Sequence, residues 1–334
     1  MTAVTVLGSG VVGLCVAAEL VAHRCDVTVV APSGGPDVSA CSWWAAGMLA
    51  PGCELESAEP LIGALASEGA AFWQARGEAE MRGTLVVAPP RDGSELRRFA
   101  AATLGHLRLE GAEIGALEPA LAGRFPAGLL FPEEGQIDPR GALGRLASEL
   151  AARGVTFDAR VARASDRGGL TVDARGLAAR DVLPDLRGVR GEMALVRAPD
   201  LAISRTVRLL HPRWPLYLVP RGKGLFVLGA TQIESERQGG VTVRSALDLL
   251  GAAYALHPAL GEAEIVELGA GLRPAFPDNL PRLRWREGAL CVNGLFRHGF
   301  LCAPALARMA VEHLLEGRRF PEVMDEDCAQ RQSA

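Results

Sequence analysis

Residues 1–31 constrain the fold of this chain more than any other stretch. Two short apolar runs rich in β-branched residues, 3–7 (AVTVL) and 26–30 (DVTVV), flank residues 11–23, whose apolar positions have helical spacing. The turn into the helix carries the pattern G-x-G-x-x-G, with its glycines at Gly8, Gly10 and Gly13. In such a unit these glycines permit a tight turn, close approach of a pyrophosphate to the backbone, and close packing of helix on strand. The stretch therefore predicts a Rossmann-like α/β unit that binds a dinucleotide at the helix N-terminus.

The second strand ends without the acidic residue that usually binds the ribose hydroxyls about twenty residues after the glycines. Ala31 occupies this position, and Pro32 and Ser33 follow it. Ser33 and Asp37 are the nearby polar residues that we consider as replacements. The missing acid does not favour NADP either, because no arginine follows the strand to meet a 2′-phosphate.

Composition excludes several classes of function. With 334 residues, 49% of them hydrophobic and 22% charged, the chain is typical of a globular enzyme with two domains. The net charge of −4 leaves no basic footprint, so we expect no nucleic-acid partner. Seven scattered cysteines without a C-x-x-C pair predict neither a disulfide framework nor a metal site, and they suit the reducing cytoplasm. Residues 11–22 are too short for a membrane span and contain Glu19. The sequence leaves open whether the protein forms a homo-oligomer.

Residues 41–51 (CSWWAAGMLAP) are too apolar and aromatic for a simple solvent loop. Packing in the core is the simpler interpretation of the two tryptophans. The small residues Ala45, Ala46 and Gly47 indicate backbone that passes close to something flat, such as a ring system.

The rest of the chain alternates between helical and strand patterns. Asp138 and Pro139 suit the N-cap and first turn of a helix, and we interpret Asp138 as a cap only. Apolar segments on either side of residues 220–224 predict a hairpin in an antiparallel sheet. We expect helices over residues 56–82, 92–106, 141–153, 243–254 and 304–315. We expect strands over residues 84–88, 156–161, 170–174, 190–197, 217–219, 225–228 and 289–293.

Several stretches between Gly8 and Leu315 occur together in a fixed order. They are GSGVVGL, SWWAAGMLAP, LEPAL, GQIDPRGAL, YLVPR with GLFVLGAT, GAGLRP and NGLFRHGFLCAPALA. In order and spacing they resemble the flavin-dependent amine oxidases of the D-amino-acid oxidase type, and within that family the glycine oxidases of thiamine biosynthesis.

The resemblance implies an α/β fold in which a discontinuous Rossmann-like domain holds FAD without a covalent bond. This FAD-binding domain would comprise residues 1–82, 138–185 and 266–334. A second domain with an antiparallel sheet would cover the flavin, and it would comprise residues 83–137 and 186–265. Ala31 departs from the family, which usually has Glu at this position.

The resemblance also implies three residues at the substrate site. Arg273, in GAGLRP, matches the arginine that binds the substrate carboxylate, which a planar guanidinium can grip with two hydrogen bonds. Tyr217 matches a tyrosine whose hydroxyl adds a further bond, although a core tyrosine with a satisfied hydroxyl fits equally well. Arg297, in FRHG, matches a residue close to substrate and flavin. We do not expect His298 to act as a base, since hydride transfer to a flavin requires none.

Contacts to the cofactor are implied for both ends of the chain. The expected residues are Gly8, Gly10, Val11, Val12, Gly13, Ser42, Ala45, Ala46, Gly47, Met48, Val161, Gly176, Arg273, Arg297, His298, Gly299, Phe300 and Leu301. The last helix is expected to begin near residues 302–304 and to direct the positive end of its dipole towards the flavin. Cys302 is expected to be a small buried residue and not a covalent link to the flavin.

The implied reaction is oxidative deamination of a small amino acid, in the first place glycine, to an imine and then an oxo acid with ammonia. Oxygen is the implied acceptor and hydrogen peroxide its product, and the imine would serve thiazole formation in thiamine biosynthesis. Three alternatives stay open. They are a sarcosine or D-amino-acid oxidase or dehydrogenase on the same fold, an NAD-linked dehydrogenase, which the missing ribose acid also disfavours, and a catalytically silent flavoprotein.

Overall fold

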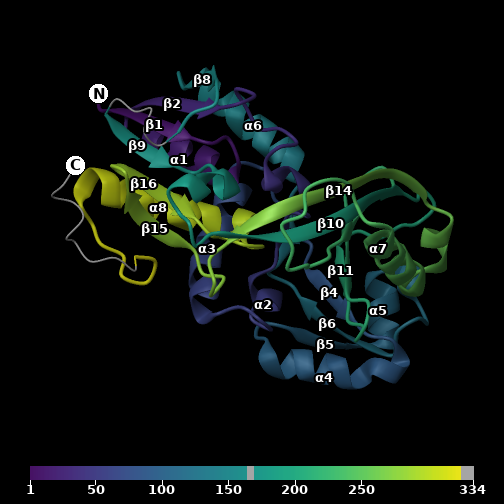
Figure 1. The fold of residues 1–334 in the computed structure, drawn as a ribbon. Coiled ribbons are helices and arrows are strands. Elements are labelled where there is room, and N and C mark those ends of the chain that lie inside the picture. The colour runs from purple at the N-terminus through teal and green to yellow at the C-terminus, as the bar shows by residue number, and fades with distance from the viewer. Residues whose placement is uncertain (164–168, 325–334) are drawn as a thin grey trace.

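Two sheets form the framework of the molecule (Figure 1). The computed structural model describes residues 1–163 and 169–324. One sheet has six strands and the other has eight. Figure 1 shows the sheet that contains β1 and β2, with its helices, in one half of the molecule and the sheet that contains β4 and β11 in the other, with the long strands β10 and β14 extending between the halves.

The six-stranded sheet is built around the predicted strand–helix–strand unit. Its order is β15-β16-β9-β1-β2-β8, and all neighbours run parallel except β15 and β16. Between β1 and β2, the pairing runs from Ala3 with Asp26 to Leu7 with Val30. The strands are β1 (Ala3–Leu7), β2 (Asp26–Ala31), β8 (Thr156–Ala159), β9 (Leu170–Asp173), β15 (Arg282–Arg286) and β16 (Ala289–Asn293).

The eight-stranded sheet has the order β14-β10-β13-β12-β11-β4-β6-β5. Every neighbouring pair is antiparallel except β11 and β4. Its strands are β4 (Thr84–Val87), β5 (Leu107–Glu110), β6 (Ala127–Phe131), β10 (Arg187–Arg197), β11 (Thr206–Leu209), β12 (Leu216–Pro220), β13 (Leu225–Gly229) and β14 (Glu264–Ala275). A separate ribbon pairs β3 (Met48–Leu49) with β7 (Gly135–Gln136).

Helices cover both sheets. Apolar side chains of α1, α3, α6 and α8 share one core with the six-stranded sheet, whereas α5 and α7 pack on one face of the eight-stranded sheet and α2 and α4 on the other. The α-helices are α1 (Val11–Ala22), α2 (Pro51–Glu54), α3 (Pro60–Ala75), α4 (Gly93–Ala102), α5 (Gly111–Leu117), α6 (Pro139–Ala152), α7 (Val243–Leu256) and α8 (Gly299–Glu316). The 3-10 helices are η1 (Cys41–Trp44), η2 (Pro90–Asp92), η3 (Pro119–Leu121), η4 (Gly176–Asp181) and η5 (Pro258–Gly261).

The predicted α/β fold, with a Rossmann-like sheet and a second antiparallel sheet, is confirmed. Asp138 caps α6, since its Oδ2 accepts the N–H of Gly141 at 3.2 Å and Pro139 lies in the first turn. The helix expected over 56–82 is shorter, because α3 begins at Pro60 and ends at Ala75. The eight-stranded sheet draws strands from two parts of the chain, and the residue bounds of the two domains stay a prediction.

The last helix, α8, begins at Gly299, so the start expected near residues 302–304 is wrong. Pro304 lies inside the helix and has no N–H to donate to the carbonyl of Phe300, four residues earlier. The indole Nε1–H of Trp73, in α3, donates to that carbonyl at 2.8 Å, and the Trp73 side chain is fully buried. Since α3 supplies the bond that Pro304 removes, the helix can extend on both sides of the proline.

We expect Trp73→Phe to destabilise the protein by about 1–3 kcal/mol, because the Phe300 carbonyl would stay buried without a donor. Trp214→Phe is the matched control, because Trp214 Nε1 donates to Asp248 at a partly exposed site where water can replace the bond. Thermal midpoints at one FAD concentration test this, with Trp73→Phe several degrees below the control. Equal midpoints for the two variants would contradict the assigned bond.

Candidate active site

The turn at the carboxyl end of β1 is formed by glycines whose backbone atoms pack closely against neighbouring elements. Gly8 has φ +104°, and a Cβ there would lie 2.5 Å from a carbonyl oxygen at the end of β9. A Cβ on Gly13 would lie 1.9 Å from the Gly8 oxygen, so α1 packs directly on the turn. A Cβ on Gly10 would lie 3.1 Å from the hydroxyl of Ser42, which accepts the N–H of Val11 at 3.2 Å. All three glycines are therefore required by packing as well as by the motif.

The N-termini of α1 and α8 meet beside this turn. A Cβ on Gly299 would lie 3.4 Å from Cγ1 of Val11. Neither helix receives a hydrogen bond from the side chain of its N-cap residue, and neither has an acidic residue in its first turn. The two helices thus direct the positive ends of their dipoles to neighbouring places. The side chains of Phe300 and Leu301 are buried, so these residues, like Val12 in α1, would serve a ligand through backbone N–H groups.

The loop after β2 holds the candidates for the ribose contact. Ala31 is buried at the end of the strand. Oδ1 of Asp37 accepts both the N–H and the hydroxyl of Ser39, at 2.9 and 2.5 Å. Burial alone raises the pKa of Asp37, but hydrogen bonds from Ser39 and Ser33 hold the pKa below its usual value, so this carboxylate is ionised. Val161 follows β8, the neighbour of β2, and its side chain is exposed.

The segment from η1 to β3 connects the glycine-rich turn with the eight-stranded sheet. Trp44 lies against β14, where a Cβ on Gly269 would lie 2.1 Å from the indole ring. The carbonyl of Ala46 accepts a hydrogen bond from Arg221, and Gly47 has φ +69°. The expected cofactor contacts of this segment are Ser42, Ala45, Ala46, Gly47 and Met48, and all lie along this connection.

One face of the eight-stranded sheet carries Tyr217, on β12, and Arg273, on β14. Glycines on neighbouring strands make room for both side chains. A Cβ on Gly229 would lie 2.5 Å from the Tyr217 ring, and a Cβ on Gly191 would lie 2.2 Å from the Arg273 guanidinium. Tyr217 belongs to an apolar cluster with Trp44, so this face of the sheet is turned towards the η1–β3 segment.

Arg273 and Tyr217 leave polar groups available to a ligand. Among residues 1–163 and 169–324, no carboxylate lies within ion-pair distance of Arg273, whose Nη1 donates to the Thr231 carbonyl at 3.2 Å. Burial lowers the pKa of Arg273. Burial raises the pKa of Tyr217, so its hydroxyl stays protonated at neutral pH, and it has no hydrogen-bond partner in the same described ranges. The alternative that Tyr217 is a core residue whose hydroxyl is already hydrogen-bonded by the protein is therefore not seen in the described residues.

Arg297, in contrast, is already paired. Its Nε donates to Oε2 of Glu54 at 2.9 Å and its Nη2 donates to the Ser57 hydroxyl at 2.5 Å. Glu54 is the last residue of α2 and is 9% exposed. Burial alone raises the pKa of Glu54, but Arg297, His298 and Arg208 together hold the pKa below its usual value. The carboxylate therefore stays ionised and neutralises the arginine that the sequence placed beside the substrate.

Sequence reasoning named neither Glu54 nor Arg208. Arg208 lies directly opposite Tyr217 in the pairing of β11 with β12, and its Nη1 is 3.8 Å from Glu54 Oε1. Glu54 and Arg297 lie 243 positions apart, so no local pattern links them. The one available signal was that Glu54 lies three residues after the end of the SWWAAGMLAP stretch.

The loop after β16 carries His298 to the start of α8. Asn293 fixes this loop, since its Nδ2 donates to the carbonyl of Gly176 at 2.9 Å. Burial lowers the pKa of His298 to about 4, although the Glu54 carboxylate lies 3.4 Å from Nδ1. A group with this pKa binds a proton too weakly to serve as a base near neutral pH. Cys302, in the same helix, is fully buried, and burial raises the pKa of its thiol to about 12.

The residues at this edge of the sheet fit a bound FAD. The closely packed glycine turn and the two uncapped helix N-termini suit a pyrophosphate, because they offer N–H groups and neither helix has an acidic residue in its first turn. The η1–β3 segment offers small side chains, and their backbone suits the edge of a flat ring. Ala31 gives the end of β2 no carboxylate for the ribose hydroxyls of FAD, so the nearest candidate is Asp37 in the following loop.

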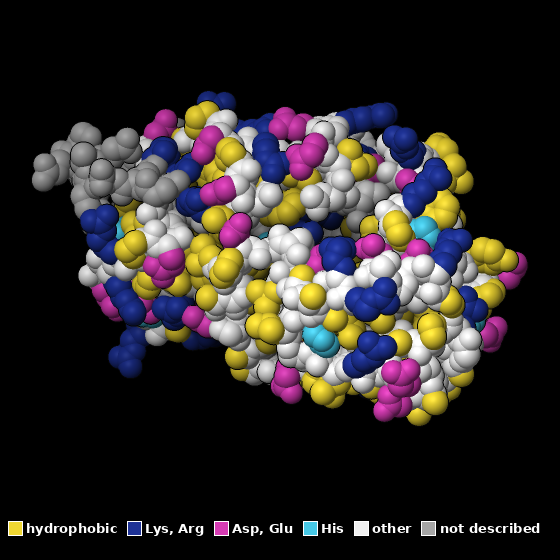
Figure 2. Space-filling model, turned by 90° about the horizontal axis from the view of Figure 1, so that it is seen from below, with side chains coloured by type: hydrophobic (Ala, Val, Ile, Leu, Met, Phe, Trp, Pro, Cys, Tyr) yellow, Lys and Arg dark blue, Asp and Glu magenta, His cyan; other side chains and the backbone are white. Residues whose placement is uncertain are grey.

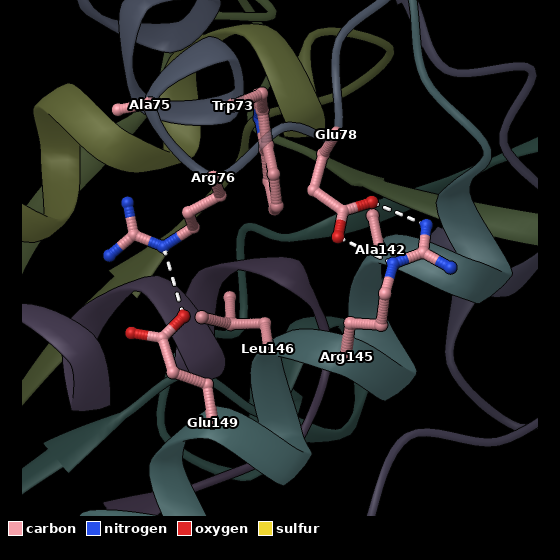
Figure 3. A pocket seen from close by; sticks show the side chains of 8 residues that line it. All are labelled: Trp73, Ala75, Arg76, Glu78, Ala142, Arg145, Leu146 and Glu149. Carbon is pink, nitrogen blue, oxygen red and sulfur yellow. Dashed lines mark hydrogen bonds and ion pairs between the residues drawn. The ribbon is translucent and has the colours of Figure 1, made fainter.

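A separate pocket of about 450 Å³ lies between α3 and α6 (Figure 3). Its charged side chains are paired with each other, Arg76 with Glu149 at 3.4 Å and Arg145 with Glu78. None of its lining residues is among the expected cofactor or substrate contacts. We therefore do not assign the active site to this pocket.

On the face in Figure 2, acidic and basic side chains are interspersed. Within residues 1–163 and 169–324, no group of three or more His, Cys, Asp or Glu side chains is placed to hold a metal ion. In that same part of the chain, no helix has the length and apolar character to cross a membrane.

Comparison with known proteins identifies the family. The chain matches the FAD-dependent oxidoreductase family over residues 3–313. It is 48% identical over 322 residues to ThiO of Rhizobium etli, named as an oxidoreductase of thiamine biosynthesis, with 96% of this chain and 98% of the relative covered. It is 28% identical to the glycine oxidase of Geobacillus kaustophilus, covering 94% of this chain and 92% of that one. The crystal structure of glycine oxidase from Bacillus cereus shares the fold, with a TM-score of 0.82, 21% identity and coverage of 98% and 99%. The chain belongs to the family of FAD-dependent oxidoreductases.

Proposed function

We propose that this protein oxidises the amine of a small amino acid, glycine in the first place, to the imine that water converts to an oxo acid and ammonia. Oxygen accepts the electrons and yields hydrogen peroxide, and the product supplies thiazole formation in thiamine biosynthesis in the cytoplasm. The observation that carries the proposal is Arg273, a cation without a carboxylate partner in the described ranges, beside a Tyr217 hydroxyl that is also free to donate. The names of the relatives in Rhizobium etli and Geobacillus kaustophilus support the substrate and the pathway.

Arg273 and Tyr217 would bind and orient the substrate. The guanidinium holds the carboxylate through two hydrogen bonds, and the hydroxyl of Tyr217 donates a third. Because both side chains lie on rigid β-strands, the Cα–H and the amine are held in one orientation. The glycine turn and the N-termini of α1 and α8 would hold FAD, which would supply a two-electron acceptor for the hydrogen on the substrate Cα.

The protonation state of the amine follows from the surrounding charges. Oxidation requires the neutral amine, and the nearby charge of Arg273 together with burial lowers the pKa of a bound ammonium group. The proton leaves to solvent, since His298 has a pKa of about 4 and does not retain it near neutral pH. Trp44 and Met193, in the same apolar cluster as Tyr217, exclude water from this face of the sheet.

Arg273→Ala tests the proposal. Loss of two charge-assisted hydrogen bonds should lower kcat/KM for glycine about 100- to 10,000-fold, while the flavin stays bound. Peroxide, ammonia and oxygen consumption are measured together, and the wild type should form peroxide and ammonia in equal amounts. Arg197→Ala is the matched control, because Arg197 lies at the exposed end of the neighbouring strand β10. Turnover of glycine by Arg273→Ala at the wild-type rate would contradict the assignment. If the wild type oxidises glycine only with a dye as acceptor, oxygen is excluded as the electron acceptor.

Ala31→Glu tests the account of the ribose end. A carboxylate at the end of β2 should accept hydrogen bonds from the ribose hydroxyls and lower the Kd for FAD about tenfold or more. Ala31→Gln controls for the added size, because it lacks the charge. Titration of apoprotein with FAD, followed by protein fluorescence, gives both values. A Glu variant that binds FAD no more tightly than the Gln variant would show that the loop around Asp37 already supplies this contact.

A further inference from the structure

The Glu54 carboxylate is a charged group of the site that the proposed reaction does not use. Its Oε2 lies 2.9 Å from Arg297 Nε and 3.4 Å from His298 Nδ1, and its Oε1 lies 3.8 Å from Arg208 Nη1. The side chain is 11% exposed. An ionised group so deeply buried is retained only where its partners compensate the lost hydration.

All three nitrogens of the Arg297 guanidinium have partners. Nε pairs with the carboxylate, Nη2 donates to the Ser57 hydroxyl, and Nη1 lies 3.5 Å from Oε1 of Gln232. Two of these partners belong to α2 and the turn that follows it. Arg297 is therefore directed to this turn and its positive charge is balanced.

The balanced arginine is close to the unbalanced one. Arg273 donates to the carbonyl of Thr231, and Arg297 contacts the side chain of the next residue, Gln232. The charge of Glu54 is also near enough to Arg273 and Tyr217 to influence the pKa of both groups. A substrate carboxylate on Arg273 would thus lie beside a second cation whose charge Glu54 already neutralises.

We propose that Glu54 is a specificity-determining residue that restricts the site to amines with a single carboxylate, because it neutralises Arg297 and repels a second anionic group. The inference rests on the proposed function, since it takes Arg273 as the site of the first carboxylate. A substrate with a second carboxylate would have to displace Glu54 from Arg297 or lie next to it as a like charge. A neutral substituent of the same size meets neither obstacle.

Two secondary amines of similar size isolate the effect of charge. Iminodiacetate and N-ethylglycine both carry a two-carbon substituent on the nitrogen of glycine, but only iminodiacetate has a second carboxylate. The wild-type holoenzyme should favour N-ethylglycine. In Glu54→Gln, which keeps the shape and removes the charge, the ratio of kcat/KM for iminodiacetate to that for N-ethylglycine should rise about tenfold or more. The change should lie in KM for iminodiacetate, because Arg297 would then bind its second carboxylate.

Three variants separate this role from a structural one. Glu54→Asp should keep the wild-type ratio, since it keeps the negative charge. Glu56→Gln, which removes a carboxylate paired with Arg98 at 2.9 Å and 3.8 Å from Arg208, should leave the ratio unchanged. Arg297→Gln should lower the ratio below the wild-type value, because the Glu54 charge would be left without its main partner. This variant tests the proposal even where Glu54→Gln fails to retain FAD.

The outcomes are distinguishable. Oxidation of glycine and N-ethylglycine with an unchanged ratio in both Glu54→Gln and Arg297→Gln would overturn this inference and leave the proposed function intact. An equal rise of this ratio in Glu56→Gln would overturn the inference too, because removal of any nearby negative charge would then have the same effect. Failure of the wild type to oxidise either of the two substrates, glycine and N-ethylglycine, so that both stay unreacted, would overturn the proposed function and this inference together.

Discussion

The close contact between Gly13 and Gly8 is the constraint on which the arrangement of the molecule depends. A Cβ at Gly13 would lie 1.9 Å from the Gly8 carbonyl oxygen, so any side chain there would push α1 off β1. With α1 in this position, Cγ1 of Val11 lies 3.4 Å from where a Cβ on Gly299 would be, and α8 begins beside α1. Two helix N-termini therefore meet at the carboxyl edge of one parallel sheet, where anionic ligands are bound in folds of this kind.

The substrate side depends on a similar use of glycine. Gly229 and Gly191 leave space on the eight-stranded sheet, and the side chains of Tyr217 and Arg273 lie in this space instead of extending outwards. The charges then divide the arginines into two kinds. Glu54 neutralises Arg297, whereas no carboxylate of residues 1–163 and 169–324 pairs with Arg273, and this difference decides which arginine suits a substrate carboxylate.

Local sequence patterns predicted what local forces determine. The strand–helix–strand unit, its glycines and the Asp138 cap follow from dihedral preferences and spacing within a few residues. The start of α8 did not follow, because the bond that accommodates Pro304 comes from Trp73, far away in the chain. For the same reason the pairing of Arg297 with Glu54 was missed: it joins a four-residue helix to a loop 243 positions later. The family resemblance named Arg297, but only the fold reveals which carboxylate neutralises it.

The central claim is that this protein, with FAD bound, takes electrons from glycine. The most direct test is the visible absorption spectrum of the holoprotein before and after anaerobic addition of glycine. We expect the flavin band to bleach with glycine and to return when oxygen is admitted. A band that persists with glycine, and that bleaches with a chemical reductant, would contradict the claim, because the flavin would then be competent and glycine would not be its substrate.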